Sequence, residues 1–126
     1  RRSMSDLTEI MIASVDYERI KKARRDNFEA MCSFLGEANQ LKALTLADDV
    51  PYSYPFMTDK NIRSALLRKH IYSPHIWSNN LTERDRGTQE YLFTENIYHL
   101  PVDQRYNAND MKNISDTVKH ILEEAE

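Results

Sequence analysis

Segments with helical periodicity alternate along the chain with short segments that favour strands, and this order limits the possible folds. Period-two alternation, or a high content of aromatic and branched residues, marks residues 44–56, 70–77 and 97–103. Interleaved helices and three or four short strands predict an α/β (α+β) domain with a small, open, mainly antiparallel sheet. We expect the helices to pack on one face of this sheet and a long helix to form at the N-terminus.

The first 36 residues are predicted to be helical. Ser3 and Asp6 have the spacing of an N-cap residue and its acidic partner, and Asp16 marks a second helix start. Gly36 follows the last apolar residue of the pattern and predicts a left-handed stop. The stretch therefore predicts two helices, or one bent helix, over residues 4–36.

A β-hairpin is predicted over residues 44–56, where Leu44 and Leu46 precede a second alternating stretch. Pro51 and Pro55 have the same parity, so their missing N–H groups lie along one side of the second strand. A strand that cannot donate along one side is typical of a sheet edge.

The later elements follow from cap signals and apolar spacing. Thr58 or Asp59 is expected to cap a short helix, and residues 70–77 are expected to form a strand. We further predict a helix over residues 88–96, a strand over residues 97–103, and an amphipathic helix that Asn107 and Asp110 start and that runs to the end of the chain.

Composition excludes several classes of protein. The chain has 126 residues, enough for one domain over residues 1–126, and its net charge of -3 argues against nucleic-acid binding. The single cysteine, Cys32, excludes an internal disulfide, and no apolar run reaches the roughly 18 residues of a membrane helix. With only two glycines, a glycine-rich phosphate cradle cannot be built. We expect a cytoplasmic protein, and the start at Arg1 suggests a chain cut from a longer one.

The polar run Asp103-Gln104-Arg105-Tyr106 is the richest group of candidate site residues. Arg105 lies between a strand end and a helix start, where a guanidinium can offer a fixed fork to a carboxylate or phosphate. A surface ion pair explains Arg105 equally well. Gln104 is a weaker neighbouring candidate.

Two further candidates lie at the end of the predicted strand over residues 70–77. His75 either lines a site or is an ordinary core or solvated histidine, and no histidine spacing supports a metal site. Trp77, the only tryptophan, either plugs the end of the sheet or faces a ligand.

Three stretches together resemble one protein family. They are "VPYSYPFMTD" at residues 50–59, "IYSPHIW" at 71–77 and "LPVDQRYNANDM" at 100–111. In this order they resemble the C-terminal small domain of fold-type I, pyridoxal-phosphate-dependent aminotransferases of the DegT and StrS type. The start "MSDLT" and the stretch at residues 15–20 also resemble the first helix of that domain, so the resemblance spans about residues 4–124.

The resemblance implies chemistry shared with a domain that this chain lacks. In such enzymes a lysine of the large domain holds pyridoxal phosphate, and the intact enzyme, a homodimer, transfers an amino group from an amino acid to a keto nucleotide sugar. The resemblance implies that Arg105, Gln104, Trp77 and His75 contact substrate, although relatives place a histidine where this chain has Ile76. We expect no catalytic residue, no bound cofactor and no transaminase activity in this chain alone.

A second hypothesis is a free-standing module that binds a ligand or another protein. The predicted edge strand and the aromatic residues Tyr52, Tyr54 and Phe56 motivate it. The two hypotheses differ in what the coding sequence upstream of Arg1 contains. Neither predicts contact with nucleic acid or a membrane.

Overall fold

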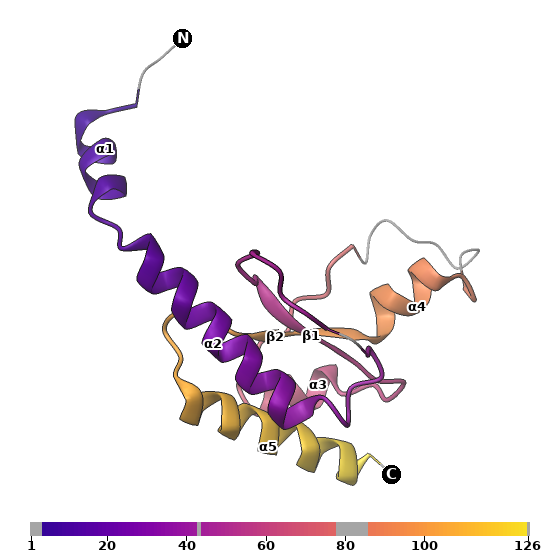
Figure 1. The fold of residues 1–126 in the computed structure, drawn as a ribbon. Helices are drawn as coiled ribbons and strands as arrows, with labels where there is room; N and C mark the ends of the chain where they lie inside the picture. Colours follow the sequence, from indigo (N-terminus) through magenta and orange to yellow (C-terminus); the bar gives the residue numbers. More distant parts are fainter. Residues whose placement is uncertain (1–3, 43, 78–85, 126) are drawn as a thin grey trace.

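The computed structural model describes residues 4–42, 44–77 and 86–125, and it has a mixed α+β architecture (Figure 1). A two-stranded antiparallel sheet lies at the centre, and α2 and α5 pack against each other beside it. The elements in chain order are α1 (Asp6–Ala13), α2 (Tyr17–Leu35), β1 (Ser53–Met57), α3 (Arg63–Arg68), α4 (Gln89–Asn96), β2 (Ile97–Pro101) and α5 (Ala108–Glu124).

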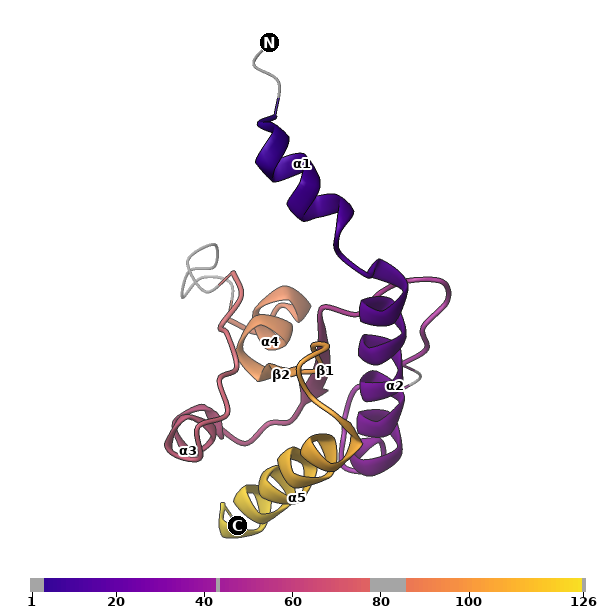
Figure 2. The ribbon, with the colours of Figure 1, turned by 90° about the vertical axis from the view of Figure 1, so that its left-hand side faces the viewer.

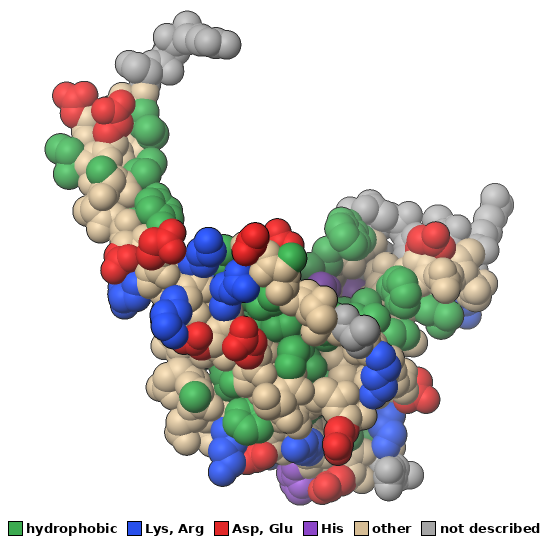
Figure 3. Space-filling view, viewed as in Figure 1, with side chains coloured by type: hydrophobic (Ala, Val, Ile, Leu, Met, Phe, Trp, Pro, Cys, Tyr) green, Lys and Arg blue, Asp and Glu red, His purple; other side chains and the backbone are tan. Residues whose placement is uncertain are grey.

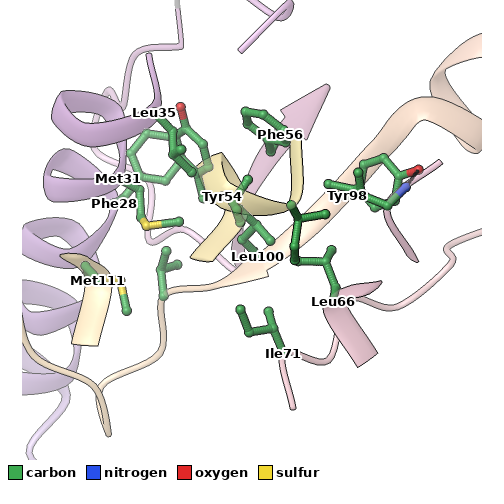
Figure 4. Packing of buried hydrophobic residues seen from close by; sticks show 14 residues of the cluster. Phe28, Met31, Leu35, Tyr54, Phe56, Leu66, Ile71, Tyr98, Leu100 and Met111 are labelled. Carbon is green, nitrogen blue, oxygen red and sulfur yellow. Dashed lines mark hydrogen bonds between the residues drawn. The ribbon is translucent and has the colours of Figure 1, made fainter. Parts of the chain in front are cut away.

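The core lies between one face of the sheet and helices α2, α3 and α5 (Figure 4). Tyr54 pairs with Leu100 and Phe56 with Tyr98 across the strands, and all four side chains are buried. The alternate residues of both strands point to the other, half-buried face. The remaining core residues are Phe28, Met31, Leu35, Ile62, Leu66, Ile71, Val102, Met111, Val118 and Ile121. This packing confirms the predicted class, with helices against one face of the sheet.

The predicted hairpin is wrong, because β1 pairs with β2 and residues 44–46 form no strand. The buried side chain of Asn39 occupies the other edge of β1. Its Oδ1 accepts a hydrogen bond from the N–H of Met57 at 2.9 Å, and its Nδ2 donates to the carbonyl of Pro55 at 2.9 Å. The N–H of Gln40 also donates to the carbonyl of Met57 at 3.0 Å. These bonds take the place of a neighbouring strand on that edge.

The strand predicted over residues 70–77 is also absent, so the described sheet has two strands rather than three or four. His70 and Trp77 adopt positive φ angles of 60° and 61°, which do not belong to an extended strand. The N–H of Ile71 donates to Leu66, and the carbonyl of Ser73 accepts from the side chain of Arg63. The backbone of this segment is therefore bonded to α3.

Helix starts were predicted better than helix ends. Asp16 and the pair Asn107 and Asp110 cap α2 and α5 as expected, and Thr88, predicted as the first residue of a helix, is the cap of α4. Ser5 caps α1, whereas the predicted cap residue Ser3 lies outside the described residues. Helix α3 begins after Ile62 with no side-chain cap, so neither Thr58 nor Asp59 caps it.

Gly36 is not left-handed. Its φ of -56° continues the helix, and a Cβ atom there would lie 2.5 Å from the carbonyl oxygen of Cys32. Close approach to that carbonyl, rather than a positive φ, favours glycine at this position.

Helix α1 extends away from the rest of the domain (Figures 1 and 2). None of its residues is buried, and Leu7 and Ile10 remain 68% and 67% exposed. Hydrophobic side chains, shown in green, line the helix in Figure 3. An apolar helix this exposed leaves hydrophobic surface in water, as is typical of a segment that contacts another chain or domain.

Candidate functional site

Two hollows lie on either side of the segment 70–77 and share Ile71, Tyr72 and Pro74 in their walls. The first, of about 470 Å³, contains Arg105 and is called the Arg105 pocket. The second, of about 750 Å³, contains Arg63 and is called the Arg63 pocket. The segment that fails to form a strand therefore builds a wall of both.

The Arg105 pocket gathers residues from all three stretches that resemble the aminotransferase family. Tyr52 comes from residues 50–59, Tyr72 from residues 71–77 and Arg105 from residues 100–111. Tyr52 and Tyr72 are 74% and 72% exposed, so their rings are open to a ligand. His99 lies in the same wall.

Arg105 forms a surface ion pair with Asp103. Its Nε and Nη2 donate to the two carboxylate oxygens of Asp103 at 2.9 and 2.8 Å, and its backbone N–H also donates to Asp103. The hydrogen bonds from Arg105 lower the pKa of Asp103, and Asp103 raises the pKa of Arg105. The Arg105 side chain is 78% exposed, so the guanidinium is held in one orientation and still reaches solvent.

Gln104 contributes to the structure of this turn. Its Oε1 accepts a hydrogen bond from Nε of Arg24 at 3.0 Å, and Nη1 of Arg24 donates to the carbonyl of Pro51 at 3.0 Å. Arg24 therefore links α2 to the residues on both sides of the pocket. The geometry places Gln104 as a support for the turn that carries Arg105.

Asn27 holds the same turn from inside the core. Its Nδ2 lies 3.0 and 3.1 Å from the carbonyl oxygens of Asp103 and Tyr106, and its side chain is buried. Asn27 and Arg24 are not among the site residues predicted from the sequence. The available signal was that Asn27 lies four residues before Met31, on the buried stripe of α2, where a polar side chain needs a partner.

The Arg63 pocket contains buried polar groups from α3 and from segment 70–77. Nη1 of Arg63 donates to the carbonyl of Ser73 at 3.2 Å, and the guanidinium lies 4.9 Å from the ring centroid of Tyr98. Nε2 of His75 lies 3.3 Å from Oε1 of Glu95 without the alignment of a hydrogen bond. Nη2 of Arg63, Oγ of Ser73 and Nε2 of His75 are buried and have no hydrogen-bond partner among the described residues.

His99 lines the Arg105 pocket but not the Arg63 pocket. Its Nδ1 is 3.0 Å from Oγ of Ser53 across the strand pair. Burial, and secondarily the positive charge of Arg63, lower the pKa of His99. The imidazole is therefore a neutral hydrogen-bonding group at physiological pH.

Trp77 lies apart from the other candidates. It is 68% exposed and lines a third hollow of about 280 Å³ with Phe93 and Ile97. The four residues proposed from the sequence thus divide among neighbouring places: Arg105 and Gln104 at the turn, His75 in the Arg63 pocket, and Trp77 at the end of segment 70–77.

Metal binding and cysteine-based chemistry have little support within the described ranges 4–42, 44–77 and 86–125. They hold no group of three His, Cys, Asp or Glu side chains placed to bind a metal ion, and no helix there has the length and apolar character needed to cross a membrane. Burial, and then the charge of Glu29, raise the pKa of the Cys32 thiol, which disfavours the reactive thiolate.

Comparison with protein-family models, curated proteins and solved structures finds no match to this chain.

Proposed function

We propose that the chain is the C-terminal small domain of a pyridoxal-phosphate-dependent aminotransferase of the DegT and StrS type. The intact cytoplasmic enzyme would transfer an amino group from an amino acid to a keto nucleotide sugar or a similar substrate. The observation that carries this proposal is the Arg105 pocket, because each of the three resembling stretches supplies residues to it. The first and third of these stretches, more than 40 residues apart along the chain, thus share one surface hollow.

Arg105 has the main binding role in this proposal. Its guanidinium, oriented by Asp103 and exposed to solvent, would contact a carboxylate or phosphate of the substrate. Tyr52 and Tyr72 would pack against the ring systems of the substrate. His75 and Trp77 border the neighbouring hollows and remain proposed substrate contacts.

The residues of this chain do not fit the cofactor itself. No lysine lines the three larger hollows, and the two glycines lie at a helix end and in an isolated turn, so no phosphate cradle forms around them. In this proposal the large domain binds pyridoxal phosphate, and the small domain closes one side of the cleft. We therefore expect the chain alone to lack transaminase activity.

The exposure of helix α1 supports the proposal that a further domain covers it. Its exposed apolar residues, with Leu7 and Ile10 more than two-thirds exposed, form a surface that the large domain would cover. The intact enzyme would be a homodimer.

A free-standing ligand-binding or protein-interaction module is the second candidate. Tyr54 and Phe56 lie in the core and do not support it, but Tyr52, Tyr72 and Trp77 are each more than two-thirds exposed. Exposed aromatic side chains are typical of recognition surfaces.

The coding sequence upstream of Arg1 separates these candidates. We expect a reading frame of a few hundred codons that includes a lysine-bearing large domain, and the encoded protein should aminate keto nucleotide sugars when given pyridoxal phosphate and glutamate. In that protein, Arg105→Ala should lower kcat/KM at least about tenfold by removing charged contacts to the substrate.

Arg19→Ala is the matched control, because it removes an equally exposed arginine that contacts Asp16 on α2, outside the pockets. It should leave kcat/KM unchanged. A start codon adjacent to Arg1 would overturn the aminotransferase proposal and favour the module. Unchanged kinetics in Arg105→Ala would remove Arg105 from the substrate site.

A further inference from the structure

The Arg63 pocket has the features of a second binding site, and His75 is the one residue of it that the proposed function uses. It is the largest of the described hollows, at about 750 Å³, and α3, segment 70–77, the end of α4 and β2 all contribute to its walls. Small-molecule sites commonly combine a hollow of this size with a few convergent polar groups.

Two hydrogen-bond donors in this pocket are buried and have no hydrogen-bond partner among the described residues, and a third buried atom, Nε2 of His75, has only the contact with Glu95 at 3.3 Å. Ser73 is only 9% exposed, and its Oγ has no partner. Nη2 of Arg63 is also unpartnered, while Nη1 of the same guanidinium bonds to the carbonyl of Ser73. The guanidinium and the serine are therefore neighbours. A buried donor without an acceptor is unfavourable, so a ligand that accepts from both groups removes that deficit.

The rest of the lining limits the charge of the ligand. Asp59 and Glu95 are acidic and lie in the same walls, so they repel a dianion. Only one guanidinium opposes them, and one of its nitrogens is already occupied by Ser73. These carboxylates therefore disfavour a doubly charged anion more strongly than a singly charged one.

The apolar lining indicates the remainder of the ligand. Apolar and aromatic side chains from α3, segment 70–77 and β2 surround the polar groups. They are Leu67, Ile71, Tyr72, Pro74 and Tyr98. A ligand as small as acetate would leave this surface in contact with water, whereas an apolar body attached to the carboxylate would cover it.

We propose that the Arg63 pocket binds a small monocarboxylic acid with an apolar body about the size of a phenyl ring. One carboxylate oxygen accepts from Nη2 of Arg63 and the other from Oγ of Ser73. Nε2 of His75 supplies a third contact at the edge of the site. The apolar body lies against Ile71 and Tyr72.

Titration of the ¹⁵N-labelled 126-residue chain with three matched probes tests this proposal. Benzoate should give saturable chemical-shift changes at residues 63, 73 and 75. Benzamide, which has the same shape without the charge, should bind at least about tenfold more weakly. Phenylphosphonate, which is a dianion at mildly alkaline pH, should also bind more weakly than benzoate under those conditions. Equal affinity for benzoate and benzamide, or shifts confined to the Arg105 pocket, would overturn the proposal.

Two substitutions identify the donors. Ser73→Ala deletes only a hydroxyl that has no partner, so the fold should persist while benzoate affinity falls about five- to tenfold. Arg63→Gln should reduce it further. Ser33→Ala and Arg68→Gln change exposed residues of the same types outside the pocket and should bind benzoate as the parent chain does.

If Arg63→Gln unfolds, Ser73→Ala alone decides the result. Parent-like benzoate binding in a folded Ser73→Ala chain would overturn the proposed carboxylate site. The outcome is independent of the aminotransferase proposal, which rests on the other pocket.

Discussion

The turn over residues 102–106 and the segment over residues 70–77 both line hollows beside the sheet, but they are held in different ways. Buried Asn27 donates to two carbonyl oxygens of the turn at 3.0 and 3.1 Å, and Asp103 accepts from both the backbone and the side chain of Arg105. In segment 70–77 one side-chain donor, Nη1 of Arg63, bonds to the backbone at the carbonyl of Ser73. Three buried polar groups around that bond have no partner among the described residues.

The two pockets therefore obtain their rigidity in different ways. The turn is fully supported by the protein and presents an exposed guanidinium, so a ligand there meets a preformed surface. The segment is under-bonded, so a ligand can complete its hydrogen bonding and order it further. Substitutions at Asn27, Arg63 and Asp103 measure this contrast.

The largest effect is expected from Asn27→Ala, which removes the internal support of the turn. The carbonyl groups of Asp103 and Tyr106 lose their buried donor, so the free energy of unfolding should fall by about 2–3 kcal/mol. Urea denaturation followed by circular dichroism measures it. Asn113→Ala, an exposed change on α5, is the control and should have little effect. A loss no larger than that of the control would mean that the turn is held by other contacts.

A smaller loss of about 1–2 kcal/mol is expected from Arg63→Gln. The variant loses one hydrogen bond to Ser73 and the contact with the Tyr98 ring. Hydrogen exchange should quicken most in residues 70–77 and little in residues 102–106. Arg68→Gln is the control on the same helix. Uniformly faster exchange across both segments would contradict the separate support of the two regions.

The smallest effect is expected from Asp103→Asn and depends on pH. The folded-state pKa of Asp103 is lowered, so the ion pair stabilises the protein above the unfolded-state pKa of about 4, and this contribution is lost as pH falls through the folded-state value. The variant should be slightly less stable than the parent at pH 7 and equally stable at about pH 2.

Arg105→Gln should reproduce that loss at neutral pH because it removes the partner of the same pair. Denaturation midpoints measured across pH report both variants. A stability difference that is the same at every pH would show that the substitution acts through packing rather than through the charge.

Local signals predicted much of the fold. The starts of α2 and α5 followed from Asp16 and Asn107, because a cap residue bonds to N–H groups within three residues of itself. The strand β2 also followed from its alternation. These features depend on neighbours in sequence, which a single chain displays.

The failures involve long-range contacts. Asn39 replaces a strand beside β1, and Arg63 binds the backbone of segment 70–77, and neither contact leaves a periodic signal. The polar run at residues 103–106 identified the turn and its exposed arginine from the sequence. The Arg63 pocket was missed because Arg63 resembles a solvated helix residue until its position over Tyr98 is known.

The bonding of Asn39 along β1 has a consequence for assembly. An unpaired strand edge is a template on which another chain can add a strand, and this is a common route to domain swapping and aggregation. Here Pro55 offers no N–H on that edge, while the amide of Asn39 binds the Pro55 carbonyl and the Met57 N–H. The Asn39 side chain thus disfavours edge-to-edge polymerisation through β1. The same bonds also disfavour pairing of this edge with a strand of a partner protein.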